Sequence, residues 1–142
     1  MADEAGDKGA AWALGQGLTD AIFRQTVAHW ASLRAASGAP TWVYDFRWES
    51  QAPGVNGAAH CVDVPFGMDI LGLPGTDAAT GPAPQALADA VHGDWLALVR
   101  DGAVGAPQSG DGREVIVYGA NGGRSIGTGY AREARLWDAT RY

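Results

Sequence analysis

The sequence predicts a fold of the α/β class, because segments with the periodicity of helices are separated by segments with the alternation of strands. Apolar side chains recur every three or four residues over residues 19–36 and 84–100, as they do on one face of a helix. Over residues 41–48 they alternate between two sets, as in a strand with two distinct faces. The chain has 142 residues, about the length of one domain.

The first helix is expected to begin at Thr19 and to end by residue 36. Thr19 is a candidate N-cap, and Asp20 follows in the first turn, where a carboxylate complements the free backbone N–H groups. Residues 1–17 are acidic, rich in Ala and Gly, and aperiodic, so they are predicted to form a flexible tail. The apolar stripe of the helix contains Phe23, Val27 and Trp30.

Residues 41–48 form the strongest predicted strand, and residues 114–118 form a second, shorter one. Two strands do not make an open parallel sheet, which needs neighbours for its strands and helices on both faces. The fold is therefore either small and irregular or part of a larger sheet. In the second case, another polypeptide would complete the sheet and its hydrophobic core. One face of the first strand carries Trp42, Tyr44, Phe46 and Trp48.

The second helix, over residues 84–100, is expected to stop at Asp101-Gly102, and residues 133–138 could form a last helical turn. Between these elements the chain is rich in glycine, with 21 in total, about 15% of the chain and roughly twice the average. Residues 103–112 and 119–127 are accordingly predicted as loops.

The net charge of −6 comes from 16 acidic and 10 basic residues, and no cluster of Lys or Arg occurs. Nucleic acids and anionic membranes are therefore poor partners on electrostatic grounds. No stretch approaches the roughly 20 apolar residues of a membrane span, and the acidic N-terminus does not have the pattern of a signal peptide. A soluble, cytoplasmic protein is expected. The single cysteine, Cys61, cannot form an internal disulfide bond.

Three sequence blocks resemble the C-terminal part of type B carboxylesterases, the branch of the α/β-hydrolases that includes para-nitrobenzyl esterases and cholinesterases. They are LTDAIF at residues 18–23, WVYDF at residues 42–46 and GAAHCVDVPF at residues 57–66. The helix that contains Trp95 and the segment at residues 133–138 resemble the family's final elements. The resemblance implies that residues 18–142 are the C-terminal portion of a carboxylesterase domain, with a partial α/β-hydrolase fold.

His60 is the candidate catalytic residue. In the family that the sequence resembles, the matching histidine is the general base of a Ser-Asp/Glu-His triad. The residue type suits this role, because an imidazole that titrates near neutral pH can take the proton of a serine and return it to the leaving alcohol. A loop with Gly57, Ala58 and Ala59 before the histidine gives it reach.

The other parts of such a catalytic site are not expected in this chain. The serine and the acidic residue precede the histidine in hydrolases, and only 59 residues precede His60, none of which form a nucleophile elbow. Asp20, Asp45 and Asp63 could orient the imidazole, but none is assigned as the acid. An N-terminal esterase polypeptide, or self-association, is therefore the expected partner, and a small ester is the substrate only after reassembly. The alternative is a non-catalytic interaction module that retains the scaffold.

Other motifs carry weaker signals. Ser125 lies in a G-x-S-x-G match at residues 123–127, but it follows His60, which reverses the hydrolase order. Residues 119–123 imitate a dinucleotide-binding turn without the βα unit that should follow. No established ligand spacing predicts a metal site, no cofactor is expected, and Cys61 is predicted to be a small buried hydrophobe. The residues considered as metal ligands are His29, His60, Cys61, Asp63 and His92.

Overall fold

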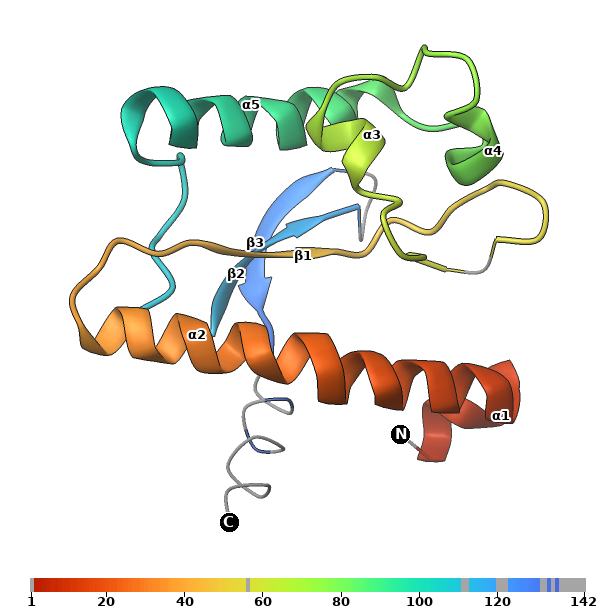
Figure 1. The fold of residues 1–142 in the computed structure, drawn as a ribbon, viewed down its shortest axis with the longest axis horizontal. Helices are drawn as coiled ribbons and strands as arrows, with labels where there is room; N and C mark the ends of the chain where they lie inside the picture. The colour runs from red at the N-terminus through yellow and green to blue at the C-terminus, as the bar shows by residue number, and fades with distance from the viewer. Residues whose placement is uncertain are drawn as a thin grey trace.

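The computed structural model of the chain describes residues 2–55, 57–110, 113–119, 123–130, 133 and 135. It confirms the α/β class, with helices around a small mixed sheet (Figure 1). Of the helices in these ranges, none combines the length and apolarity needed to cross a bilayer. The elements are α1 (Ala2–Thr19), a π-helical turn (Asp20–Arg24), α2 (Gln25–Ala36), β1 (Val43–Phe46), α3 (Val64–Gly67), α4 (Asp77–Thr80), α5 (Gln85–Asp101), β2 (Glu114–Tyr118) and β3 (Arg124–Thr128).

The sheet has the order β1-β2-β3, in which β1 and β2 are parallel and β3 is antiparallel to β2. The register pairs Val43 with Val115 and Phe46 with Tyr118. In Figure 1, β1 crosses in front of the other two strands, with α5 on one side of it and α2 on the other. The sheet is thus the middle of three layers, and within the described residues β1 is an edge strand.

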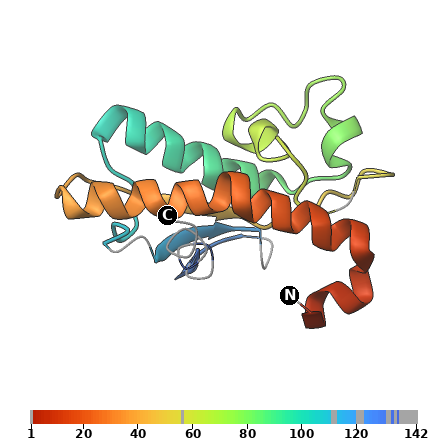
Figure 2. The ribbon, with the colours of Figure 1, turned by 60° about the horizontal axis from the view of Figure 1, so that its bottom comes forward.

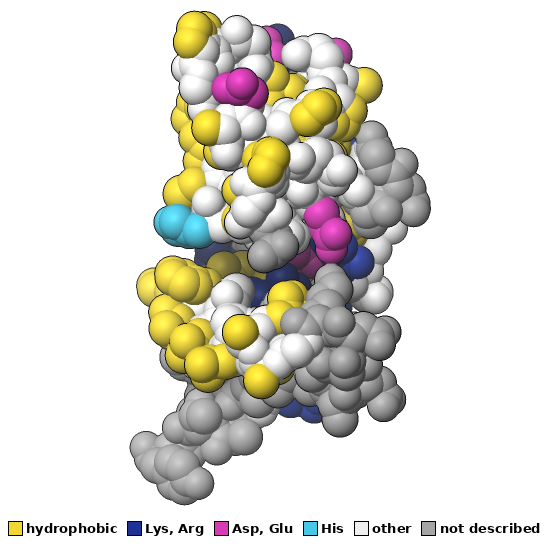
Figure 3. All heavy atoms as spheres, turned by 90° about the vertical axis from the view of Figure 1, so that its right-hand side faces the viewer, with side chains coloured by type: hydrophobic (Ala, Val, Ile, Leu, Met, Phe, Trp, Pro, Cys, Tyr) yellow, Lys and Arg dark blue, Asp and Glu magenta, His cyan; other side chains and the backbone are white. Residues whose placement is uncertain are grey.

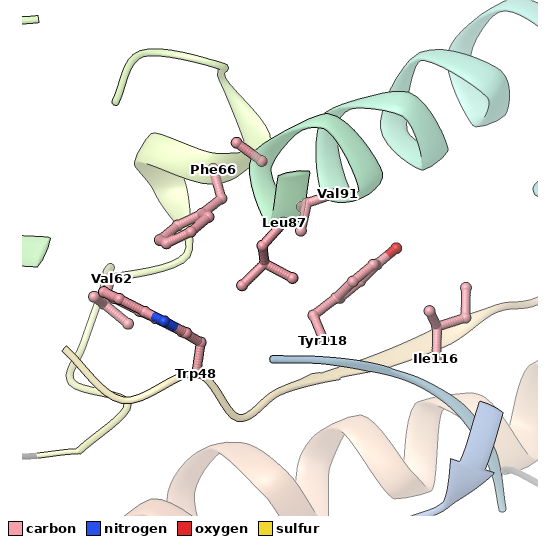
Figure 4. Close-up of a cluster of buried hydrophobic side chains, with 8 residues drawn as sticks. Trp48, Val62, Phe66, Leu87, Val91, Ile116 and Tyr118 are labelled. Carbon is pink, nitrogen blue, oxygen red and sulfur yellow. The ribbon is translucent and has the colours of Figure 1, made fainter. Parts of the chain in front are cut away.

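One hydrophobic core lies between the sheet and the layer of α3 and α5 (Figure 4). The Phe66 side chain is fully buried and lies 5.1 Å from the Phe46 ring and 5.0 Å from the Trp48 ring, centroid to centroid. Gly119 has a φ of 88° and leaves no room for a Cβ atom beside Trp48, so the chain turns closely over this core. The buried members are Trp48, Val62, Phe66, Leu87, Ala88, Val91, Ile116 and Tyr118.

The opposite face of the sheet is covered by α2 through small side chains. Ala28 and Ala31 are buried against this face, where β1 and β2 contribute Val43, Val115 and Val117. The apolar stripe of the helix points elsewhere, because Phe23, Val27 and Trp30 are all exposed. The predicted stripe is therefore not the face with which α2 packs on the sheet.

The N-terminal part of the chain differs from the prediction. Residues 1–17 were predicted as a tail, but α1 begins at Ala2 and runs through this segment, with a bend at Gly9, where φ is 81° (Figure 2). Thr19 is not an N-cap, since its backbone is helical and its side chain caps nothing. Alanine-rich sequence is a good helix former, and it extends the helix upstream of the apolar stripe from which the boundary was inferred.

The predicted strands at residues 41–48 and 114–118 are present as β1 and β2, and the helix at residues 84–100 is α5, which ends at Gly102 with φ 69°. The expectation of two strands at most is wrong, because β3 forms where residues 123–127 were predicted as a loop. Its Ile126 pairs with Ile116, so cross-strand pairing outweighs the low strand propensity of glycine. Of the predicted last helical turn, only positions 133 and 135 lie within the described residues.

Candidate active site

His60 lies in a turn beyond the carboxyl end of β1, and its side chain is exposed. The turn is fixed at both ends. Before it, the Ser50 N–H donates to the Gly57 carbonyl over 3.1 Å, and after it the buried Val62 side chain enters the core. Cys61 adopts a left-handed backbone with φ 63°, which is uncommon for a residue other than glycine. The imidazole is thus presented to solvent from an anchored turn.

A cavity of about 650 Å³ adjoins His60 and the glycine and alanines before it. Figure 3 faces the carboxyl end of β1 and shows a hollow with basic and acidic side chains in it, between two regions with many hydrophobic side chains. The charged residues that line this cavity are Arg24, Asp45, Arg47, Glu49 and Glu133.

Arg24 is the centre of the charged cluster in the cavity. Its Nε donates to Glu133 Oε1 over 3.0 Å, and its two terminal nitrogens donate to Asp45 over 3.3 and 3.4 Å. The guanidinium also lies 4.7 Å from the centre of the Tyr130 ring. Burial lowers the pKa of Arg24, but Asp45, Tyr130 and Glu133 outweigh that effect and raise it. The arginine therefore stays charged and holds the π-helical turn before α2, β1 and the chain beyond β3 together.

The three carboxylates considered as partners of His60 have other partners. Asp20 is buried, where it accepts a hydrogen bond from Gln16 and pairs with Arg24. Asp45 is bound by Arg24 and, at 2.8 Å, by the Nε of Arg47. Asp63 accepts from the Tyr44 hydroxyl over 3.0 Å. Within the described residues, no hydrogen bond or ion pair joins His60 to a carboxylate, so no triad forms there.

Ser125 is not placed as a nucleophile. It lies in the middle of β3 and pairs with Val117, and a strand interior does not present a side chain on a sharp strand-to-helix turn. Of the glycine-rich turn that precedes β3, residues 120–122 lie outside the described part of the chain.

The metal reading also finds no support. The described residues contain no cluster of three or more His, Cys, Asp or Glu side chains that could hold an ion. The Nδ1 of His92 lies 2.8 Å from the Gly67 carbonyl, to which it donates, so this histidine fastens α5 to α3. Cys61 is exposed, and the prediction that it is buried is wrong, because the turn at residues 60–63 directs Val62 into the core.

A groove follows the side of β1 that β2 leaves open. It consists of three adjoining hollows of about 400, 330 and 610 Å³, all of which are lined by Trp42 and Val43, and the 330 Å³ hollow also extends under α5 to Ile116 and Tyr118 of β2. One wall belongs to α2 and the other to α5, and both carry exposed apolar side chains. We call this groove the β1 slot. Its main lining residues are Val27, Trp30, Trp42, Val43, Tyr44, Leu98 and Val99.

Sequence reasoning proposed His60 as a site residue and did not predict the charged cluster and the groove that the structure places near it. The charged cluster has one local signal, the spacing of four residues between Asp20 and Arg24 on a helix. The β1 slot also has a signal in the sequence. The apolar stripe of Phe23, Val27 and Trp30 requires a surface to cover it, and the sequence predicts too few strands to provide one. No model of a known protein family matches the chain.

Proposed function

We propose that this chain is the C-terminal part of a serine carboxylesterase and supplies His60 as the general base. The observation that carries the proposal is the position of His60, exposed on an anchored turn beyond the carboxyl end of β1 and beside a cavity. In open α/β sheets, ligands bind outside the carboxyl ends of the strands. A parallel strand pair with helices on both faces is compatible with a portion of an α/β-hydrolase fold.

His60 would act on a serine that a second polypeptide provides, together with an acidic residue and an oxyanion hole. The imidazole takes the proton as the serine oxygen attacks the ester carbonyl, and then returns a proton to the leaving alcohol. Its exposure allows it to meet such a group, whereas an imidazole already paired inside this chain would have to break that contact first. The isolated chain is expected to be inactive.

The test is hydrolysis of p-nitrophenyl acetate by this chain with and without an N-terminal esterase polypeptide that carries a G-x-S-x-G elbow. Activity is expected only for the mixture, and His60→Ala should reduce it by about three orders of magnitude or more. Cys61→Ser, a change in the same turn, is the matched control and should retain activity. Turnover by the chain alone that a serine-directed inhibitor blocks would contradict the proposal.

A second candidate is a non-catalytic interaction module, and the β1 slot favours it equally. An open strand edge and exposed apolar side chains both promote association. The two functions differ at His60. If a complementing polypeptide gives activity that His60→Ala leaves intact, the histidine is not the base and the interaction module is supported.

A further inference from the structure

The floor of the β1 slot is a row of backbone groups. The Val43 N–H donates to Ser109 Oγ over 3.1 Å, and the Arg47 N–H donates to the Tyr118 carbonyl over 2.7 Å. Successive residues of a strand direct these groups to opposite sides, so Tyr44 and Phe46 direct theirs away from β2, into the slot. The Tyr130 hydroxyl already donates to the Tyr44 carbonyl there, over 3.1 Å. Within the described residues, neither the Tyr44 nor the Phe46 N–H has a partner outside the sheet.

The two walls of the slot are apolar and carry large exposed side chains. Trp30 on α2 is 61% exposed, and Val99 on α5 is 85% exposed. The lining side chains and their exposed neighbours Phe23 and Leu33 offer on the order of 800 Å² of apolar surface, about what one partner contributes to a stable interface. A strand inserted between the walls would direct alternate side chains to α2 and to α5.

We propose that the β1 slot binds one β-strand, apolar on both faces and parallel to β1, from the polypeptide that carries the nucleophile. This inference rests on the proposed function. A strand buried on both faces in a parallel sheet is a nearly continuous apolar run. The walls around Trp30 and Val99 are mostly apolar, and the two charged residues in them are already bound within this chain: Arg34 donates to Thr41 and to the Pro40 carbonyl, and Asp94 accepts from Tyr118 and Arg124. The other charged residues of the slot, Arg24, Asp45 and Asp63, line the hollow toward the carboxyl end of β1 and also have partners within this chain.

The parallel direction follows from the position of the charged cavity. A parallel strand would end beside His60, so that the residues after it are delivered into that cavity. An antiparallel strand would deliver its beginning there instead. The parallel direction is the one that suits the proposed partner, because a nucleophile elbow follows a strand. The incoming strand would accept from the Tyr44 and Phe46 N–H groups and donate to the Phe46 carbonyl, while the Tyr130 hydroxyl keeps its bond to Tyr44.

Binding is tested with the peptide acetyl-Lys-Val-Ile-Val-Ile-Val-Lys-amide, titrated into the full chain and followed by amide resonances in ¹⁵N NMR. Saturable one-to-one binding is expected, with hydrogen exchange of the Tyr44 and Phe46 amides slowed at least tenfold. Val99→Glu should weaken binding about tenfold or more, because it places a charge in an apolar wall. The matched control is Leu73→Glu, at an exposed leucine outside the slot, which should change the affinity less than twofold.

The direction of the bound peptide relative to β1 is determined by alkylation of Cys61, the single cysteine, which follows His60 in the sequence and is exposed. A bromoacetyl group on the C-terminal lysine of the peptide should alkylate Cys61 at least five times faster than the same group on the N-terminal lysine. Equal or reversed rates would overturn the parallel direction.

Absence of saturable binding, or equal binding to the Val99→Glu variant, would overturn the proposal. So would a homodimer in sedimentation equilibrium that Val99→Glu dissociates, because the slot would then belong to a second copy of this chain. The His60→Ala variant separates this inference from the proposed function. It should bind the peptide as the parent chain does, so a loss of complemented activity with unchanged peptide binding would leave the slot proposal intact.

Discussion

The two sides of the sheet are covered in opposite ways. On the side of α5 and α3, large side chains such as Phe66 and Tyr118 are buried against one another. On the side of α2, alanines contact the sheet and the large side chains of the helix face out. One side is a finished hydrophobic core, while the other is held by small contacts and by the ion pairs of Arg24. The large side chains that α2 leaves exposed are among those that the proposed second polypeptide would cover.

The largest contrast is expected between two phenylalanines, one on each side. Phe66→Ala removes a fully buried ring and should lower the free energy of unfolding by about 4 kcal/mol. Phe23→Ala, at a ring that is 58% exposed, should change it by less than about 0.5 kcal/mol. Urea unfolding followed by circular dichroism measures both. Equal costs would mean that the side of α2 is already a closed core.

The ion pairs on the side of α2 are expected to carry part of its stability. Asp45 is 3% exposed and is bound by two arginines, so Asp45→Ala should cost about 3 kcal/mol by leaving Arg24 short of a partner. The control is Asp101→Ala, which breaks an exposed pair with Arg100 and should leave the free energy of unfolding nearly unchanged. If both changes cost the same, the Arg24 cluster is no more than a surface network.

Much of the fold could be predicted from the sequence, but the two sides of the sheet could not be told apart. The alternation over residues 41–48 and the helical period over residues 84–100 identify β1 and α5, because in each of them apolar side chains on one face pack into this chain's own core. The stripe of α2 is equally clear, yet it marks the exposed face. Periodicity shows which side chains share a face and does not show whether this chain or another covers it.

The candidate site was predictable only as a single residue. His60 was predicted from the residues that flank it, GAAHCVDVPF at residues 57–66. The cavity beside it gathers Arg24, Asp45 and Glu133, which are separated by up to 109 positions in the sequence. No local pattern connects such residues. Their pairing depends on how α2, β1 and the segment after β3 meet.

Alkaline pH should weaken the side of α2. Burial first, and then the charge of Asp45, raise the pKa of Tyr130 to about 12, against an ordinary value near 10. The native state therefore holds this proton more firmly than the unfolded state, and the stability that Tyr130 contributes is complete below pH 10 and is lost as the pH rises toward 12.

The loss should amount to about 2 kcal/mol and should be missing from Tyr130→Phe. Tyr44 and Tyr118 also have raised pKa values, because burial disfavours their ionised forms, so the comparison with this variant is what isolates Tyr130. The cost of Tyr130→Phe, measured by urea unfolding at pH 9 and again at pH 11.5, should shrink or reverse. A constant cost would mean that the Tyr130 hydroxyl is open to water.

The smallest expected effect concerns the turn that presents His60. Cys61 has a φ of 63°, a conformation that costs a residue with a Cβ atom about 1 kcal/mol and costs glycine almost nothing. Cys61→Gly should therefore raise the free energy of unfolding by about 0.5 kcal/mol, because the greater freedom of glycine in the unfolded chain offsets part of the gain. Cys61→Ala keeps the Cβ atom and should change nothing. If the glycine variant gains stability while complemented ester hydrolysis falls, strain in this turn holds the imidazole in place. If both variants are neutral, the turn is relaxed, and the position of His60 depends only on the anchors at Gly57 and Val62.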